Sequence, residues 1–205
     1  MNTLSTDVVD LARRRCWLFD MDGTLTRAMH DFDAMRATLG LPEGVPILEA
    51  LDRMSPAEAR EKRRALDAME LDMAAAATVQ PGCVPLLETL LERGAALAIV
   101  TRNGADIARV TLEACDIDHF FPDHAVVSRD CCAPKPDPAG VHLALERLGG
   151  RPDEAVMVGD YRFDLEAGRN AGVATVHLDV DGGETWPAAT DLRVDSLDAL
   201  ARLLR

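Results

Sequence analysis

Aromatic side chains are scarce in this chain, and long apolar runs are missing. Phe, Trp and Tyr together make up 4% of the 205 residues. A hydrophobic core must therefore be built mainly from Ala, Leu and Val. The longest uninterrupted apolar stretches are short, such as residues 95–100, whereas a helix that crosses a bilayer needs about 20 apolar residues. We therefore expect no membrane-spanning segment and no membrane partner.

An excess of positive charge is also absent. The 22 Lys and Arg residues are outnumbered by 35 Asp and Glu residues, so the formal net charge is −13. Such a surface repels the phosphate backbone of nucleic acids, which we therefore do not expect as partners. A small phosphorylated metabolite is still compatible with this charge, because a divalent cation held by carboxylates reverses the local field.

Cysteine pairs at metal-ligand spacing are absent as well. The five cysteines include the neighbours Cys131 and Cys132, but no CxxC motif and no Cys/His pattern. This usage fits neither a disulfide framework nor a zinc site. The arginines at 13–15 precede only four apolar residues, too few for the apolar part of an export signal. We predict a cytoplasmic protein with reduced thiols, either a monomer or a homodimer.

Short apolar runs alternate with amphipathic helical patterns along most of the chain. This alternation is typical of a parallel sheet covered by helices. We therefore predict an α/β fold, a Rossmann-like doubly wound parallel sheet, that ends in a helix over residues 195–204. The expected strands are residues 16–19, 96–100, 125–127, 155–158 and 173–178.

The segment between the first two apolar runs breaks this alternation. From about residue 26 to residue 79 there are helical patterns but no convincing strand. The longest pattern opens with SPAE, in which Ser55 can cap a helix and Pro56 can occupy its first turn. Because open α/β sheets bind ligands at the carboxyl ends of their strands, an insertion here would cover the ligand site. We predict a core domain of residues 1–25 and 80–205 and a small all-helical cap, or lid, of residues 26–79.

Two carboxylates follow the first apolar run in the sequence LFDMDGT. Alternation along a strand aims Asp20 and Asp22 the same way. Like charges at a strand end are unfavourable unless a cation or a substrate uses them. A simple turn would explain Asp-Gly alone. For DxDGT after a buried strand, we favour a catalytic or metal-binding pair.

Three further candidate elements come after later apolar runs. Thr101 offers a hydroxyl and backbone N–H groups next to a helix start, where an anion is favoured. Lys135 stands between two prolines that restrict its backbone. Asp160 and Asp164 flank the start of a helix. Taken singly, these residues also fit a helix cap, a solvated lysine and partners of a helix dipole.

The order of these four elements is far more specific than any one of them. DMDGT, TRN, PKP and GDxxxD resemble, in this order, the four motifs of the haloacid dehalogenase-like hydrolase superfamily. The chain is similar to the phosphatases of this superfamily that carry a helical cap after the first strand, such as phosphoglycolate phosphatases. The resemblance spans about residues 16–178 and implies a phosphoric monoester hydrolase. Dehalogenases lack an acid at the position of Asp22, which favours phosphoryl transfer here.

The resemblance also implies a role for each matched residue. Asp20 would attack phosphorus and become an aspartyl phosphate, while Asp22 would protonate the leaving oxygen and later deprotonate water. Mg²⁺ would be held by Asp20, the Asp22 backbone carbonyl and Asp160. Asp164 would act on Lys135 or on metal-bound water. The residues implied in holding the other phosphoryl oxygens are Thr101, Arg102, Asn103 and Lys135.

Other functions stay open at this point. A sugar phosphomutase of the same superfamily shares the core, although the sequence around His30 fits its pattern poorly. Phosphonate-cleaving relatives need a cap lysine, and Lys62 lies in a charged stretch that suggests a solvent-facing helix surface. A receiver-like module, which binds partners when phosphorylated, also combines aspartates, a threonine and a lysine. Substrate contacts in the cap, which would suit a phosphoglycolate-like molecule, are limited to candidates: Arg27, His30, Arg36 and Arg53.

Overall fold

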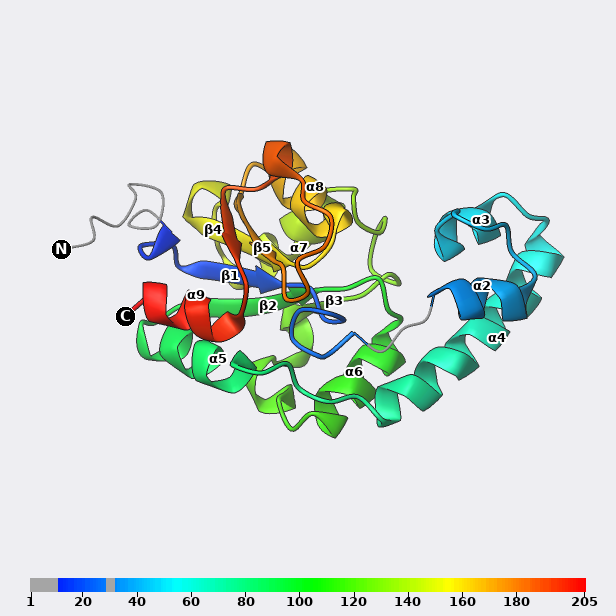
Figure 1. The fold of residues 1–205 in the computed structure, drawn as a ribbon, viewed down its shortest axis with the longest axis horizontal. Helices are drawn as coiled ribbons and strands as arrows, with labels where there is room; N and C mark the ends of the chain where they lie inside the picture. The colour runs from blue at the N-terminus through cyan, green and yellow to red at the C-terminus, as the bar shows by residue number, and fades with distance from the viewer. Residues whose placement is uncertain (1–10, 29–31) are drawn as a thin grey trace.

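The centre of the protein is a six-stranded parallel sheet. The computed structural model describes residues 11–28 and 32–205, and Figure 1 shows the sheet between two layers of helices. The strand order is β3-β2-β1-β4-β5-β6, so the direction of winding reverses at β1. In doubly wound folds, this reversal opens the crevice in which ligands bind. The strands are β1 (Cys16–Phe19), β2 (Ala96–Val100), β3 (Val126–Val127), β4 (Ala155–Gly159), β5 (Ala174–Leu178) and β6 (Leu192–Val194).

The central strand β1 is buried on both faces, which explains its continuous apolar sequence. Trp17 and Phe19 pack into the core on one face of the sheet, and Cys16 and Leu18 pack into the core on the other. The first face is covered by α5 (Cys83–Glu92), α6 (Ala105–Ala114) and α9 (Leu197–Leu203), and the second by α7 (Ala139–Leu148) and α8 (Arg162–Asn170). The predicted Rossmann-like doubly wound sheet is therefore confirmed.

Beyond the carboxyl end of β1, three helices precede α5 among the described residues (Figure 1). They are α2 (Phe32–Leu39), α3 (Ile47–Asp52) and α4 (Pro56–Ala75), and they share a hydrophobic cluster of their own, centred on Leu51 and Leu66. The chain enters and leaves this segment at adjacent points, where Arg27 N donates to Thr78 O at 2.9 Å. Below that point, α4 packs on α6 of the core.

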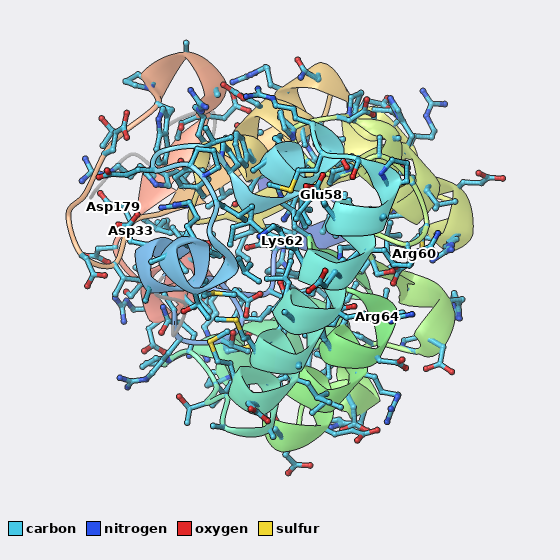
Figure 2. All side chains as sticks on the ribbon, turned by 90° about the vertical axis from the view of Figure 1, so that its right-hand side faces the viewer. Asp33, Glu58, Arg60, Lys62, Arg64 and Asp179 are labelled. Atoms are coloured by element: carbon cyan, nitrogen blue, oxygen red, sulfur yellow. The ribbon has the colours of Figure 1, made fainter. Side chains whose placement is uncertain are left out.

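The outer surface of α4 carries the expected charged side chains. Glu58, Arg60 and Arg64 are exposed there, on the side of the molecule seen in Figure 2. Lys62 differs, because it is only partly exposed and its ammonium donates to the carbonyl of Leu39. The expectation of a solvent-facing stretch therefore fails at Lys62, which ties α4 to the end of α2. Across the described residues, none of the helices is both long and apolar enough to cross a bilayer.

Local signals placed several element boundaries to within one or two residues. Ser55 caps α4 as predicted, because its hydroxyl oxygen accepts from Glu58 N. α7 starts at Ala139, directly after Pro138, and Asp137 Oδ1 accepts from Ala139 N at 2.8 Å. β6 was missed, because its alternation of apolar and polar residues runs over only three positions; it pairs with β5 at the edge of the sheet. Ala125, expected in a strand, lies in a short 3₁₀ turn before β3.

Candidate active site

The carboxyl ends of β1, β2 and β4 bring the motif residues to one edge of the sheet. Asp20 follows β1, Thr101 follows β2 and Asp160 follows β4. Phe19, the last residue of β1, is in register with Ile99 on one side and Val158 on the other. Side chains from distant parts of the sequence therefore meet beside a cleft of about 540 Å³. All eight predicted site residues line it: Asp20, Asp22, Thr101, Arg102, Asn103, Lys135, Asp160 and Asp164.

Lys135 lies between two of these carboxylates. Its ammonium donates to Asp20 Oδ1 and contacts Asp164 Oδ1 at 2.6 Å. The lysine side chain is 2% exposed, and Asp20 and Asp164 are 13% and 3% exposed. Burial alone would lower the pKa of Lys135, but the charges of Asp164 and Asp20 outweigh it and raise that pKa. An ammonium whose charged form is stabilised by two carboxylates therefore lies next to the carboxylate predicted to be the nucleophile.

The two carboxylates that contact Lys135 also lie close to a third, that of Asp160. Ligand oxygens of Asp20, Asp160 and Asp164 lie within 4.8 Å of one another. Burial and then the charge of Asp20 raise the pKa of Asp160 well above its usual range, and raise that of Asp164 to about 6. Carboxylate oxygens packed this closely repel one another. A hard divalent cation bound among them would remove this repulsion. The residues present therefore fit Mg²⁺.

The backbone at Gly23 leaves room for this cluster. Its φ of +88° lies in the left-handed region that favours glycine. A Cβ atom there would lie 2.3 Å from Asp160 Oδ2, closer than two atoms can pack. The neighbouring Thr24 hydroxyl donates to Asp160 Oδ1 at 2.9 Å and orients that carboxylate. The glycine and threonine of DGT thus shape the carboxylate site.

Asp22 is held by a different partner. Its Oδ2 accepts a hydrogen bond from Asn103 Nδ2 at 2.6 Å. Asn103 is itself fixed by a bond from its backbone N–H to Thr101 Oγ1 at 3.1 Å. The Thr101 N–H donates to Val127 O at 2.9 Å, which anchors the loop to β3. Asp20 and Asp22 therefore have separate surroundings, although they are two residues apart in the sequence.

Arg102 reaches from the loop after β2 to α3. Its guanidinium donates to both carboxylate oxygens of Glu49 on α3, at 2.8 Å each, and to the Lys135 carbonyl at 3.0 Å. It also lies over the ring of Phe163, with its central carbon 4.7 Å from the ring centroid. The side chain predicted to hold phosphate is thus engaged with Glu49 in this conformation.

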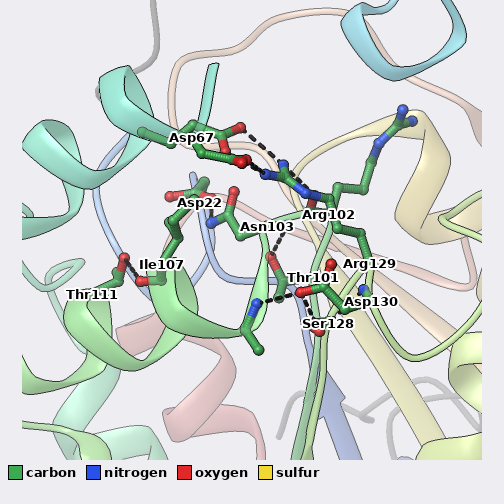
Figure 3. A network of polar contacts seen from close by, with 12 residues as sticks. Asp22, Asp67, Thr101, Arg102, Asn103, Ile107, Thr111, Ser128, Arg129 and Asp130 are labelled. Carbon is green, nitrogen blue, oxygen red and sulfur yellow. Dashed lines mark hydrogen bonds and ion pairs between the residues drawn. The ribbon is translucent and has the colours of Figure 1, made fainter. Parts of the chain in front are cut away.

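Arg129 forms a second link of this kind, to α4, and was not identified from the sequence. Its side chain is 6% exposed and pairs with Asp67 and Glu70 of α4. Figure 3 shows Arg129 beside Asp67, close to Arg102 and Asn103. No local pattern marks this residue, because its partners are about 60 residues away in the sequence.

The candidate substrate contacts in the cap are only partly in the cleft. Arg36 lines it, forms an ion pair with Asp33 and keeps a buried Nε without a hydrogen-bond partner. Arg27 and Arg53 are exposed and do not line this cleft. His30 falls outside the described residues.

The receiver-module alternative is wrong. Receiver-type sheets have the strand order 2-1-3-4-5. Here β2 lies between β1 and β3, and β1 pairs with β4. The winding of this sheet therefore reverses at a different place in the strand order from that of a receiver-type sheet.

The family model described as "Haloacid dehalogenase-like hydrolase" matches residues 33–178, more than half of the chain. "Pyrophosphatase PpaX" of Bacillus velezensis is 43% identical over 104 residues, 50% of this chain and 48% of that protein. The "Uncharacterized hydrolase YOR131C" of Saccharomyces cerevisiae is 37% identical over 78% of this chain and 75% of its own. A phosphoglycolate phosphatase of Rhodospirillum rubrum is 32% identical over 78% of this chain and 77% of its own.

Solved structures agree with these relatives. A hydrolase from Pseudomonas syringae superimposes with a TM-score of 0.75 at 26% identity, covering 93% of this chain and 97% of that one. A Bacteroides vulgatus protein provisionally named as a β-phosphoglucomutase has a TM-score of 0.75 at 19% identity, covering 97% and 96%, and so shares the fold. The resemblance predicted from the four motifs is confirmed: the chain belongs to the haloacid dehalogenase-like hydrolase family.

Proposed function

We propose that this enzyme hydrolyses a small phosphate monoester with the help of Mg²⁺ and through a phosphorylated Asp20. The coarser statement, that it is a phosphatase-like enzyme, follows from the family model and from relatives named as phosphoglycolate phosphatase and pyrophosphatase. The observation that carries the finer proposal is the meeting of four sequence motifs in one cleft, with Lys135 bridging Asp20 and Asp164.

In the proposed first step, an oxygen of Asp20 attacks phosphorus and the ester P–O bond breaks. Asp22 donates a proton to the departing oxygen, which leaves as an alcohol. In the second step, Asp22 takes a proton from water, whose oxygen attacks the same phosphorus. Inorganic phosphate leaves, and the Asp20 carboxylate is restored. The separate partners of the two aspartates, Lys135 for Asp20 and Asn103 for Asp22, support this division of roles.

The charge on the transferred group needs stabilisation, and this chain offers several groups for it. Lys135 and the hydroxyl of Thr101 would hold phosphoryl oxygens, and so would the loop of Arg102 and Asn103. Asp20 and Asp160, with the Asp22 carbonyl, would hold Mg²⁺, which supplies positive charge next to the phosphoryl group. Asp164 would keep Lys135 in place, a role that their 2.6 Å contact supports.

Residues 26–79 would act as a lid over this site. They carry their own hydrophobic cluster, and α2, α3 and α4 each contribute residues to the cleft wall. A covered site excludes water from the reaction and selects small substrates. In the lid, Arg36 is the best placed cation for a carboxylate on the substrate, which supports a phosphoglycolate-like molecule.

The test is phosphate release from a panel of small esters, with Mg²⁺ and with EDTA. We expect release only with Mg²⁺, and a loss of at least about a hundredfold in Asp20→Asn, because the nucleophile is gone. Asp153→Asn is the matched control, since this 65% exposed aspartate precedes β4 at the opposite end of the strand. Equal activity in Asp20→Asn would rule out Asp20 as the nucleophile.

A sugar phosphomutase is the second candidate, and the β-phosphoglucomutase-like neighbour shares the fold. A mutase would move the phosphoryl group between two positions of a sugar phosphate and release little phosphate. Sugar phosphates therefore belong in the panel, with the isomeric product measured beside free phosphate. The monomeric or dimeric state and the cytoplasmic location stay predictions from the sequence.

A further inference from the structure

Arg129 is itself buried and lies at the centre of a polar network that ends on Asp22. Its Nη1 donates to Glu70 Oε1 at 3.1 Å and to the Arg102 carbonyl at 3.2 Å. Its Nη2 donates to Glu70 Oε2 at 2.8 Å and to Asp67 Oδ1 at 2.7 Å. Glu70 is 7% exposed, so this ion pair is largely removed from water. A planar guanidinium can satisfy these acceptors together, which an ammonium cannot.

The same residue holds the loop that carries Asn103. The Arg129 backbone N–H donates to the Asn103 carbonyl at 3.0 Å, while its side chain binds the Arg102 carbonyl. Arg129 therefore donates hydrogen bonds to two successive carbonyl groups of this loop. Asn103 in turn donates from Nδ2 to Asp22 Oδ2 at 2.6 Å (Figure 3). A continuous chain of contacts leads from α4 of the lid to the Asp22 carboxylate.

We propose that Arg129 is a positioning residue, which sets the placement of Asp22 through Asn103 and couples it to the seating of α4 over the cleft. This inference rests on the proposed function, in which Asp22 protonates the leaving oxygen. When Glu70 and Asp67 hold the guanidinium, the Arg102-Asn103 loop is fixed and Asp22 is aimed at the leaving group. When α4 moves away, Arg129 loses its partners and the acid loses its orientation.

Leaving-group dependence separates this role from a merely structural one. An alkyl ester needs a proton on its departing oxygen, whereas p-nitrophenolate leaves with little help from an acid. We expect Arg129→Ala to lower kcat/KM by about tenfold to a hundredfold for ethyl phosphate and by less than about threefold for p-nitrophenyl phosphate. Asn103→Ala should show the same bias, because it removes the next link in the chain.

Glu49→Gln is the matched control for lid closure. It weakens the ion pair of Glu49 with Arg102, another contact between the lid and the core, and leaves the hydrogen bond from Asn103 to Asp22 in place. Its effect should therefore be equal for the two esters. If Arg129→Ala fails to fold, Arg129→Lys replaces it in the test. Lysine keeps a positive charge beside Glu70 but lacks the planar guanidinium that binds several acceptors at once. This variant should show the same bias, to a smaller extent.

Two outcomes would overturn the inference. The first is an equal loss of kcat/KM for both esters in Arg129→Ala and Arg129→Lys, with unfolding temperatures close to wild type. It would show that Arg129 only holds the lid on the core and does not orient Asp22. No phosphate release by the wild type from either ester would remove the proposed function, and the role of Arg129 with it. The wild-type rates thus distinguish the two failures.

Discussion

At the scale of single residues, Gly23 shows how a glycine can be required by a neighbour rather than by its own turn. Its positive φ is shared by several turn glycines, including Gly94. What distinguishes Gly23 is the carboxylate of Asp160 next to it, because nothing lies within 4 Å of a Cβ atom built on Gly94. The two positions therefore separate backbone strain from the loss of space beside the proposed metal site.

We predict that Gly23→Ala lowers the apparent affinity for Mg²⁺ by at least about tenfold, because the new methyl group must displace Asp160. Titrating phosphatase activity with Mg²⁺ measures this shift. Gly94→Ala should leave the Mg²⁺ titration unchanged and cost only about 1–2 kcal/mol of stability from the left-handed backbone. Unchanged Mg²⁺ dependence in Gly23→Ala would show that Asp160 is not a metal ligand.

At the scale of elements, the helices α2, α3 and α4 pack around apolar residues that are separate from the two cores of the sheet. Leu51 of α3 is 0% exposed in this small cluster, and Leu86 of α5 is 0% exposed in the core on one face of the sheet. The same truncation at the two positions can show whether residues 26–79 open as a unit.

We predict that Leu51→Ala speeds amide hydrogen exchange across α2, α3 and α4 while β1 and β4 keep their protection. The cavity should cost about 2–5 kcal/mol within the lid cluster, and local opening exposes the amides of one cooperative unit. Leu86→Ala should instead speed exchange in the sheet and its helices. Faster exchange in β1 and β4 of Leu51→Ala would argue against a separate lid.

At the scale of the whole molecule, the net charge of −13 and the buried carboxylates oppose folding in the absence of a cation. A ligand that binds only the folded state stabilises it by mass action. We predict that Mg²⁺ at about a hundred times its dissociation constant raises stability by about 2.7 kcal/mol, or roughly 5–10 °C in Tm.

Thermal unfolding in EDTA and in Mg²⁺ measures this effect without any substrate. Potassium chloride at the same ionic strength is the control for general charge screening. Asp160→Asn should lose most of the Mg²⁺ effect and keep the effect of potassium chloride. Equal stabilisation of wild type by the two salts would speak against a specific cation site.

The sequence was sufficient for the parts of this protein that depend on local patterns. Burial on both faces makes β1 a continuous apolar run, so the strand could be recognised without its partners. Ser55 and Pro56 mark the start of α4 because capping needs only residues within one turn. The four motifs identified the family for the same reason, since each is a short segment with its own chemistry.

Tertiary structure alone decided which of these groups touch each other. Arg102 looked like a phosphate ligand in TRN, yet its guanidinium is bound to Glu49 of a helix more than 50 residues away. Arg129 carried no signal at all, although it links α4 to the loop that holds Asn103. The sequence by itself determined the fold class, the family and the motif residues, because periodicity and motif spacing are local properties. The partners across the cleft depended on how α3 and α4 pack against the rest of the protein, because a contact between distant segments leaves no periodic trace in either one.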